Sequence, residues 1–327
     1  LKPFWRKFAV SASSKTSSLP KARQAALRPP MSRPRYNPVA LVTGGARGIG
    51  RGISEALAEE GYDLLLAFGT NQEAAEAYAE ELRARGTKVA ISGGDVAEEE
   101  TIARYFEVLA KDFREQQLRA VVHNAGQVIG VTAENSAGIQ GTDEKPTLGS
   151  LLKADGSVDL SHMEYYHNIY AKAWVRIVER SLAVMESGSI VGISSPGCNC
   201  TLQPAGGYDM PGSAKTVMET TARYYAKHLA ARGVTVNVVI PGATSSDAWK
   251  ALGKGKGKQG NEMVDMVAGS ICPMGRAASC REIGDVVAFL CSPRARYITG
   301  VALPVDGGFH LGVPKPPQTL PEGGKGK

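Results

Sequence analysis

The sequence has few cysteines and no long apolar run, and both absences narrow the class of protein. Its 327 residues include five cysteines, without a Cys-x-x-Cys motif or a neighbouring pair of histidines. Cys198-Asn-Cys200 is too closely spaced for an ordinary disulfide, so we expect reduced thiols and no zinc site. No stretch approaches the roughly eighteen apolar residues of a membrane-spanning helix. The sequence therefore predicts neither a bound metal nor a membrane span.

Acidic residues are absent from positions 1–37, which carry nine Lys and Arg residues. The whole chain has 38 Lys and Arg against 32 Asp and Glu, a net charge of +6. Subtracting nine from 38 leaves 29 basic residues, so residues 38–327 sum to −3. The basic charge belongs to this arm, and we expect no nucleic-acid-binding surface on the folded part.

The arm is rich in Ser, Ala and Arg, the composition of an organelle transit peptide. The chain begins with Leu1, however, and Met31 stands just before the first predicted strand. We favour a start at Met31 and a cytoplasmic protein, with an organelle as the alternative if residues 1–30 are a genuine transit peptide. The predicted organisation is a disordered arm (1–37), one folded domain (38–312) and a disordered tail (313–327).

Apolar, β-branched runs alternate with amphipathic stretches along most of the chain. The predicted strands are Val39–Val42, Asp63–Phe68, Lys88–Ile91, Arg119–His123, Ser189–Ile193, Val234–Ile240 and Val301–Val305. Helices are predicted between them, among others over Gln72–Arg85, over Ala222–Arg232, and from a Ser279-Cys-Arg-Glu282 capping box through Leu290. This alternation predicts an α/β fold, a single doubly wound domain around a seven-stranded parallel sheet.

Two internal segments interrupt this alternation, residues 127–162 and 250–262. Long connections without secondary structure in a compact domain are usually lids or disordered segments. The second contains a Lys-Gly run at 254–258, for which we keep two readings open. It is either a mobile, solvated loop or a contact for the phosphates of a carrier-linked thioester.

The first predicted strand runs into Thr43-Gly-Gly-Ala-Arg-Gly-Ile-Gly50, and a helix follows. Glycines allow a tight turn and a close approach of the backbone to a pyrophosphate, whose charge the helix N-terminus meets. Because this motif occupies the first strand–helix unit, its context is that of a dinucleotide-binding loop.

The spacing Gly44-x3-Gly48-x-Gly50 resembles that of the short-chain dehydrogenase/reductase family. Four further short motifs extend the resemblance over residues 38–310, each at a predicted strand end: Asp95-Val96, Asn124-Ala125-Gly126, Pro241-Gly242 and Val305-Asp-Gly-Gly308. The resemblance implies that these strand ends bind a nicotinamide cofactor. The residues expected to contact it are Gly44, Arg47, Gly48, Ile49, Gly50, Thr70, Asp95, Val96, Asn124, Ala125, Gly126, Lys215, Pro241, Gly242, Thr244 and Ser246.

An acidic residue past the second strand would hold the ribose 2′-hydroxyl of NAD, but residues 67–71 contain none. Arg47 inside the glycine loop carries a guanidinium suited to a 2′-phosphate. In NADP-using relatives a basic residue occupies this position. We therefore predict NADP(H), with a solvated Arg47 as the alternative.

The resemblance also implies a catalytic set of Asn, Ser, Tyr and Lys. Ser195 ends the fifth strand, and Asn168 matches the asparagine of the preceding helix, with an ordinary polar helix residue as the alternative reading. No tyrosine is followed by lysine four residues later, and Tyr208-x6-Lys215 is the candidate pair. A positioned phenol neutralises the oxygen that becomes negative when hydride is delivered, and a neighbouring ammonium lowers the pKa of that phenol.

The Tyr-x6-Lys spacing resembles that of enoyl-thioester reductases, so the leading reading is reduction of an activated C=C bond. Two features depart from those enzymes: Cys198 stands where they often carry a further tyrosine, and Ser195 and Tyr208 keep the thirteen-residue separation of carbonyl reducers. The alternative is an NADPH-dependent carbonyl reductase, and a third reading is an NADPH-binding protein without turnover. We expect a small-molecule or carrier-linked substrate and, by resemblance, a homodimer or homotetramer.

Overall fold

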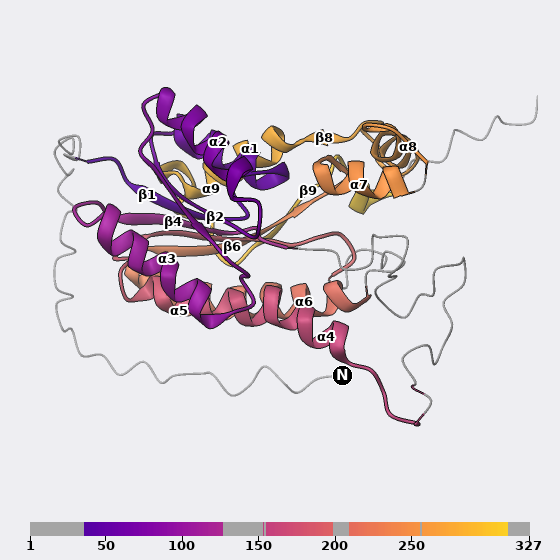
Figure 1. Ribbon diagram of the computed structural model, residues 1–327, viewed down its shortest axis with the longest axis horizontal. Helices are drawn as coiled ribbons and strands as arrows, with labels where there is room; N and C mark the ends of the chain where they lie inside the picture. Colours follow the sequence, from indigo (N-terminus) through magenta and orange to yellow (C-terminus); the bar gives the residue numbers. More distant parts are fainter. Residues whose placement is uncertain (1–35, 127–152, 154, 199–208, 256, 313–327) are drawn as a thin grey trace, which may run out of the picture. The chain divides into compact units, whose positions relative to one another are not determined.

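Seven parallel strands form one sheet in the order β3-β2-β1-β4-β5-β6-β9 (Figure 1). The computed structural model describes residues 36–126, 153, 155–198, 209–255 and 257–312. The strands are β1 Val39–Thr43, β2 Asp63–Phe68, β3 Val89–Gly93, β4 Leu118–His123, β5 Gly188–Ile193, β6 Val234–Pro241 and β9 Ala302–Val305. The strand order reverses between β1 and β4, and the carboxyl ends of the strands at such a point are where sheets of this kind usually bind ligands.

The predicted α/β fold, doubly wound around seven parallel strands, is confirmed. The sequence also gives β2 with its observed bounds, and it errs by up to two residues at the other strand ends. The largest error is at β3, which begins at Val89 and ends at Gly93 instead of running over 88–91. Sequence patterns locate strand interiors better than ends, because strand ends depend on pairing with the neighbouring strand.

Helices cover both faces of the sheet (Figure 1). One layer consists of α1, α2 and α9, and the other of α3, α5 and α6. The bounds are α1 Gly48–Glu59, α2 Gln72–Ala84, α3 Glu99–Asp112, α4 Ser161–Tyr166, α5 Ala173–Leu182, α6 Asp209–Leu229, α7 Asp247–Gly255, α8 Glu262–Ile271 and α9 Cys280–Cys291. A π-helical turn, η1, spans His167–Lys172 between α4 and α5. No helix in these stretches is both long and apolar enough to cross a bilayer.

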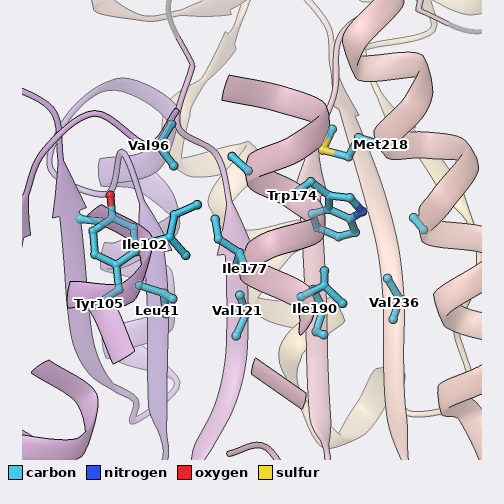
Figure 2. Packing of buried hydrophobic residues seen from close by; sticks show 14 of the residues in the cluster. Leu41, Val96, Ile102, Tyr105, Val121, Trp174, Ile177, Ile190, Met218 and Val236 are labelled. Carbon is cyan, nitrogen blue, oxygen red and sulfur yellow. The ribbon is translucent and has the colours of Figure 1, made fainter. Parts of the chain in front are cut away.

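The largest hydrophobic core cluster of the described residues lies between the sheet and the layer of α3, α5 and α6 (Figure 2). Leu41, Val121, Ile190 and Val236 come from four different strands, and each is almost fully buried. The alternation of side chains along each strand sends their neighbours to the opposite face, where α1, α2 and α9 cover them. Both faces are therefore apolar, as the near-continuous hydrophobic runs of the sequence predict.

Helices α1 and α9 cross at two glycines. A Cβ atom on Gly52 would lie 2.2 Å from the carbonyl oxygen of Cys280, and one on Gly284 would lie 2.1 Å from that of Gly52. The backbones therefore approach so closely that neither position accommodates a side chain. Helix α9 opens with the predicted capping box, in which the Ser279 Oγ accepts from the Glu282 amide at 3.1 Å.

Two predictions about helices are corrected. Residues 250–262 were expected to lack secondary structure, but α7 runs through the first half of the Lys-Gly run and ends at Gly255. Its glycine 253 is buried and would place a Cβ only 3.3 Å from the Cβ of Met263 on α8, so helix packing explains a glycine that reads as a loop signal. The helix expected over Ala222–Arg232 is longer: it begins at Asp209, as Pro211, a residue typical of a first helical turn, indicates, and it ends at Leu229.

Candidate active site

The glycine loop lies between β1 and α1, and its glycines adopt backbone conformations and close approaches that a side chain would prevent. Gly44 and Gly48 adopt positive φ angles of 63° and 52°. A Cβ atom on Gly50 would lie 1.9 Å from the carbonyl oxygen of Gly44, so no side chain fits there. The loop thus leaves the amino end of α1 open to an anionic group, as a pyrophosphate-binding loop requires. Ile49 is the second residue of α1 and packs partly buried against the core.

The Asn124-Ala125-Gly126 segment is tied to this loop through Thr43. The Thr43 Oγ1 atom accepts from the backbone N–H groups of Asn124 and Ala125, at 3.1 and 2.9 Å. The Asn124 side-chain amide in turn donates to the carbonyl oxygens of Thr43 and Gly44, both at 3.1 Å. These four hydrogen bonds hold the loop against the end of β4, at the point where the strand order reverses.

Further predicted cofactor residues gather at the same edge of the sheet. Pro241 ends β6, and the Thr244 hydroxyl donates to the carbonyl oxygen of Gly242 at 2.9 Å. A Cβ atom on Gly48 would lie 3.8 Å from the Cβ of Ser246, so the segment after β6 lies beside the glycine loop. Asp95 and the buried Val96 follow β3. The structure thus brings both sides of the predicted cofactor site to one edge.

Residues 67–71, at the end of β2 where the adenosine ribose is expected, include no acidic residue, and Arg47 lies in the glycine loop. Arg47 is the exposed N-cap residue of α1. β2 ends at Phe68, and the exposed Thr70 and the α2 cap Asn71 follow it. These residues fit a cofactor that carries a 2′-phosphate, because a guanidinium can pair with it and no carboxylate repels it.

Lys215 and Ser195 lie together, as the sequence predicts. The Lys215 side chain is 7% exposed and comes from α6, while Ser195 follows β5. The ammonium donates to the Ser195 Oγ at 2.9 Å and approaches the carbonyl oxygen of Ser194 at 3.4 Å. It also lies 4.7 Å from the centroid of the Tyr170 ring, a cation–π contact. A buried cation therefore stands beside a hydroxyl at the carboxyl edge of the sheet.

Of the other two predicted catalytic residues, the structure describes Asn168 but not Tyr208. Asn168 lies in the π-helical turn η1, next to the Tyr170 that contacts Lys215. Tyr208 lies outside the described residues, as do positions 127–152 of the predicted long connection. The catalytic role of Tyr208 therefore stays a prediction, and α6 begins immediately after it, at Asp209.

Sequence reasoning missed four residues around this site: His123, Tyr170, Ser194 and Glu219. The Ser194 hydroxyl donates to the buried Glu219 carboxylate, which is one turn past Lys215 on α6. The four-residue interval between Lys215 and Glu219 is a signal that could have found this residue, since such pairs share one helix face. The sequence around Tyr170 does not identify it as a site residue, because its ring contacts Lys215 only in the folded chain.

The four described cysteines are Cys198, Cys272, Cys280 and Cys291, and all are free thiols. Cys198 is buried close to the site, beside Ser194 and within the influence of Lys215. Burial raises the pKa of its thiol, and the positive charge of Lys215 offsets only part of this effect. The thiol is therefore protonated at neutral pH and is a poor nucleophile.

Comparison with known proteins identifies similar sequences over most of the chain. A family model described as "Enoyl-(Acyl carrier protein) reductase" matches residues 44–310. The chain is 32% identical, over 275 residues, to the 3-oxoacyl-(acyl-carrier-protein) reductase FabG of Staphylococcus aureus, covering 83% of this chain and 98% of that protein. The matched region contains the glycine loop, Ser195 and Lys215.

Solved structures give the same picture. The L-sorbose reductase of Gluconobacter frateurii, complexed with NADPH and L-sorbose, has a TM-score of 0.69 and 25% identity, covering 84% of this chain and 97% of that one. A short-chain dehydrogenase/reductase of Serratia marcescens has a TM-score of 0.67 and 25% identity, covering 84% of this chain and 98% of that one. The similarity therefore spans nearly the whole of each relative.

Proposed function

Because the chain belongs to the short-chain dehydrogenase/reductase family, we propose that it is an oxidoreductase that uses NADPH to reduce a carbonyl group. The observation that carries this proposal is the buried Lys215 ammonium, 2.9 Å from the Ser195 hydroxyl at the edge that also holds the glycine loop. A cation and a hydroxyl placed together can stabilise an oxygen on which negative charge develops. The substrate is a small ketone or a carrier-linked acyl group.

Each residue then has a defined task in the reaction. When bound, NADPH supplies the hydride. Ser195 donates a hydrogen bond to the substrate oxygen, and Tyr208 transfers a proton to it as the negative charge develops. Lys215 lowers the pKa of the Tyr208 phenol through its positive charge and binds the nicotinamide ribose. The Thr43 and Asn124 hydrogen bonds keep the cofactor loop fixed beside these groups.

Carbonyl reduction is now preferred to the reduction of a C=C bond, which the sequence placed first. The names of the relatives, a 3-oxoacyl reductase and a sorbose reductase, support carbonyl chemistry. So does the thirteen-residue separation of Ser195 and Tyr208. The six residues between Tyr208 and Lys215 remain the argument for enoyl chemistry, together with the description of the matching family model.

A paired substrate assay tests the choice. NADPH consumption is followed by the absorbance of the reduced nicotinamide, with acetoacetyl and crotonyl thioesters of the same carrier. We expect the keto substrate to be preferred by at least about a hundredfold in kcat/KM, since the site would stabilise an alkoxide and not a distant enolate. Turnover confined to the crotonyl thioester would restore the enoyl reading. NADPH binding without turnover of any ketone or enone would favour a non-catalytic protein.

Replacing Arg47 with glutamate should change the cofactor preference. We expect NADPH binding to weaken by about a hundredfold, since a charge-assisted contact with the 2′-phosphate is replaced by repulsion. NADH binding should change much less, because NADH lacks this phosphate. Fluorescence titration with both cofactors measures the ratio.

The matched control is Arg114→Glu, which changes the charge equally at an exposed residue between α3 and β4, at the opposite edge of the sheet. It should leave both affinities unchanged. Equal losses of NADPH and NADH affinity in Arg47→Glu would mean that the glycine loop had been damaged, and the assignment of Arg47 would be withdrawn.

A further inference from the structure

His123 is the last residue of β4 and lies fully inside the protein, between two parts of the site. It is 1% exposed. Its Nδ1 atom is 3.1 Å from the Thr43 Oγ1 at the start of the glycine loop, and its Nε2 is 3.0 Å from the carbonyl oxygen of Ile169 in η1. Trp174 lies on the core side, with ring centroids 6.4 Å apart. One side chain thus contacts both the glycine loop and the turn that carries Asn168.

The chemistry of the partners fixes which atom donates. The carbonyl oxygen of Ile169 can only accept, so the proton of the imidazole is on Nε2. Burial lowers the pKa of His123 to about 4, and the nearby charge of Lys215 acts in the same direction. The ring is therefore neutral, and Nδ1 accepts from the Thr43 hydroxyl. The Thr43 oxygen remains available to accept from the N–H groups of Asn124 and Ala125, as observed.

The π-helical turn explains why the Ile169 carbonyl can receive a side-chain donor. In an α-helix the N–H of Ala173 would donate to Ile169, four residues before it. Here it reaches the carbonyl oxygens of Asn168 and Tyr170 instead. The imidazole N–H of His123 donates to the Ile169 carbonyl oxygen, to which the Ala173 N–H does not donate.

This turn determines where Asn168 lies relative to α5. A π-turn inserts one residue into the helical path, which rotates the residues before it by about 100° relative to those after it. Asn168 is among the residues at this insertion, and Tyr170, which contacts Lys215, is two positions further on. Loss of the turn would therefore redirect both side chains.

We propose that His123 is a positioning residue for the reaction, which couples the glycine loop to the π-helical turn through its two ring nitrogens. Nδ1 holds Thr43 and, through it, the cofactor loop; Nε2 holds the Ile169 carbonyl and, through it, Asn168 and Tyr170. The effect on turnover rests on the reductase function proposed above, whereas the coupling itself does not.

Two substitutions test the two ring nitrogens one at a time. The side-chain amide of asparagine would lie near the position of Nδ1, and that of glutamine near the position of Nε2. His123→Asn can accept from Thr43 but does not reach Ile169. His123→Gln can donate to Ile169 but leaves Thr43 without its acceptor. Losing a buried hydrogen bond is expected to cost about tenfold. We expect His123→Asn to lower mainly kcat, and His123→Gln to raise mainly the Kd for NADPH.

Amide hydrogen exchange gives a readout that needs neither cofactor nor substrate. In His123→Asn, peptides covering 167–173 should exchange faster than in the wild type, while those covering 43–50 change little. In His123→Gln the pattern should be reversed. Thr43→Val removes the hydroxyl from the other side of the same contact and serves if the histidine variants fold poorly. Because it also leaves the N–H groups of Asn124 and Ala125 without their acceptor, it should accelerate exchange at 43–50 at least as much as His123→Gln, with 167–173 little changed.

Opposite patterns in the two variants support the coupling. Equal acceleration of both peptides in both variants, or none in either, would make His123 an ordinary core residue and overturn the inference. If the wild-type protein reduces no carbonyl compound and the exchange patterns still separate, the proposed function fails and the coupling stands. If it is an active reductase and the patterns do not separate, only the coupling fails.

Discussion

Replacing Lys215 with methionine should lower turnover by about 10²–10⁴-fold and also weaken NADPH binding. The range is that of a lost proton-transfer group, because without the ammonium the Tyr208 phenol keeps an ordinary, high pKa. Methionine retains a long apolar side chain, so it can remain in the buried space against Tyr170 while removing the donor that now contacts Ser195. Steady-state kinetics at saturating NADPH give kcat, and fluorescence titration gives the affinity.

The matched control is Lys250→Met, at a lysine on α7 whose side chain is 51% exposed and pairs only with Asp247 of the same helix in the described residues. An exposed pair of this kind contributes little, so both kinetic parameters should be unchanged. Thermal unfolding should show that Lys215→Met is folded. A folded Lys215→Met protein with wild-type kcat would remove Lys215 from the mechanism.

Replacing Tyr208 with phenylalanine should lower turnover by a similar factor, about 10²–10⁴-fold, with NADPH affinity retained. The substitution removes only the hydroxyl that donates the proton, whereas Lys215 remains to bind the ribose. Lys215→Met and Tyr208→Phe should therefore differ more in their affinity for NADPH than in kcat. The same kinetic and titration measurements distinguish them.

Tyr224→Phe is the control for the hydroxyl, because Tyr224 is on α6 and is 65% exposed. It should behave as the wild type. Wild-type turnover in Tyr208→Phe would make the residue an ordinary part of its loop. Two arguments would then fail together: the one for enoyl reduction, from the spacing of Tyr208 and Lys215, and the one for carbonyl reduction, from the spacing of Ser195 and Tyr208.

Much of the fold and part of the site could be predicted from the sequence, because both depend on short local patterns. The glycine loop, the Asn124 segment and Ser195 each follow an apolar strand, and the carboxyl ends of parallel strands meet at one edge. Lys215 was predictable as a member of the same site as Ser195 through the family resemblance. The structure places the two 2.9 Å apart.

The rest depends on contacts between residues far apart in the sequence. In the sequence, His123 is only the last residue of an apolar strand. Its hydrogen bond to the Ile169 carbonyl oxygen depends on the packing of β4 against η1. The π-turn itself has no local signature in His-Asn-Ile-Tyr-Ala-Lys. Helix α7 was missed for a related reason: Gly253 indicates a loop by propensity, yet close packing against α8 favours a glycine there.

The glycine crossing of α1 and α9 has a consequence for how the protein is made. Ile53 and Leu57 on α1 share their core cluster with Ile283 and Val287 on α9, which leave the ribosome last among the helices described. The first helix of the domain thus lacks part of its packing until synthesis is nearly complete, and contacts this distant in sequence slow folding. A chain truncated before α9 would contain every predicted cofactor residue and still lack the packing that covers α1, the helix that follows the glycine loop.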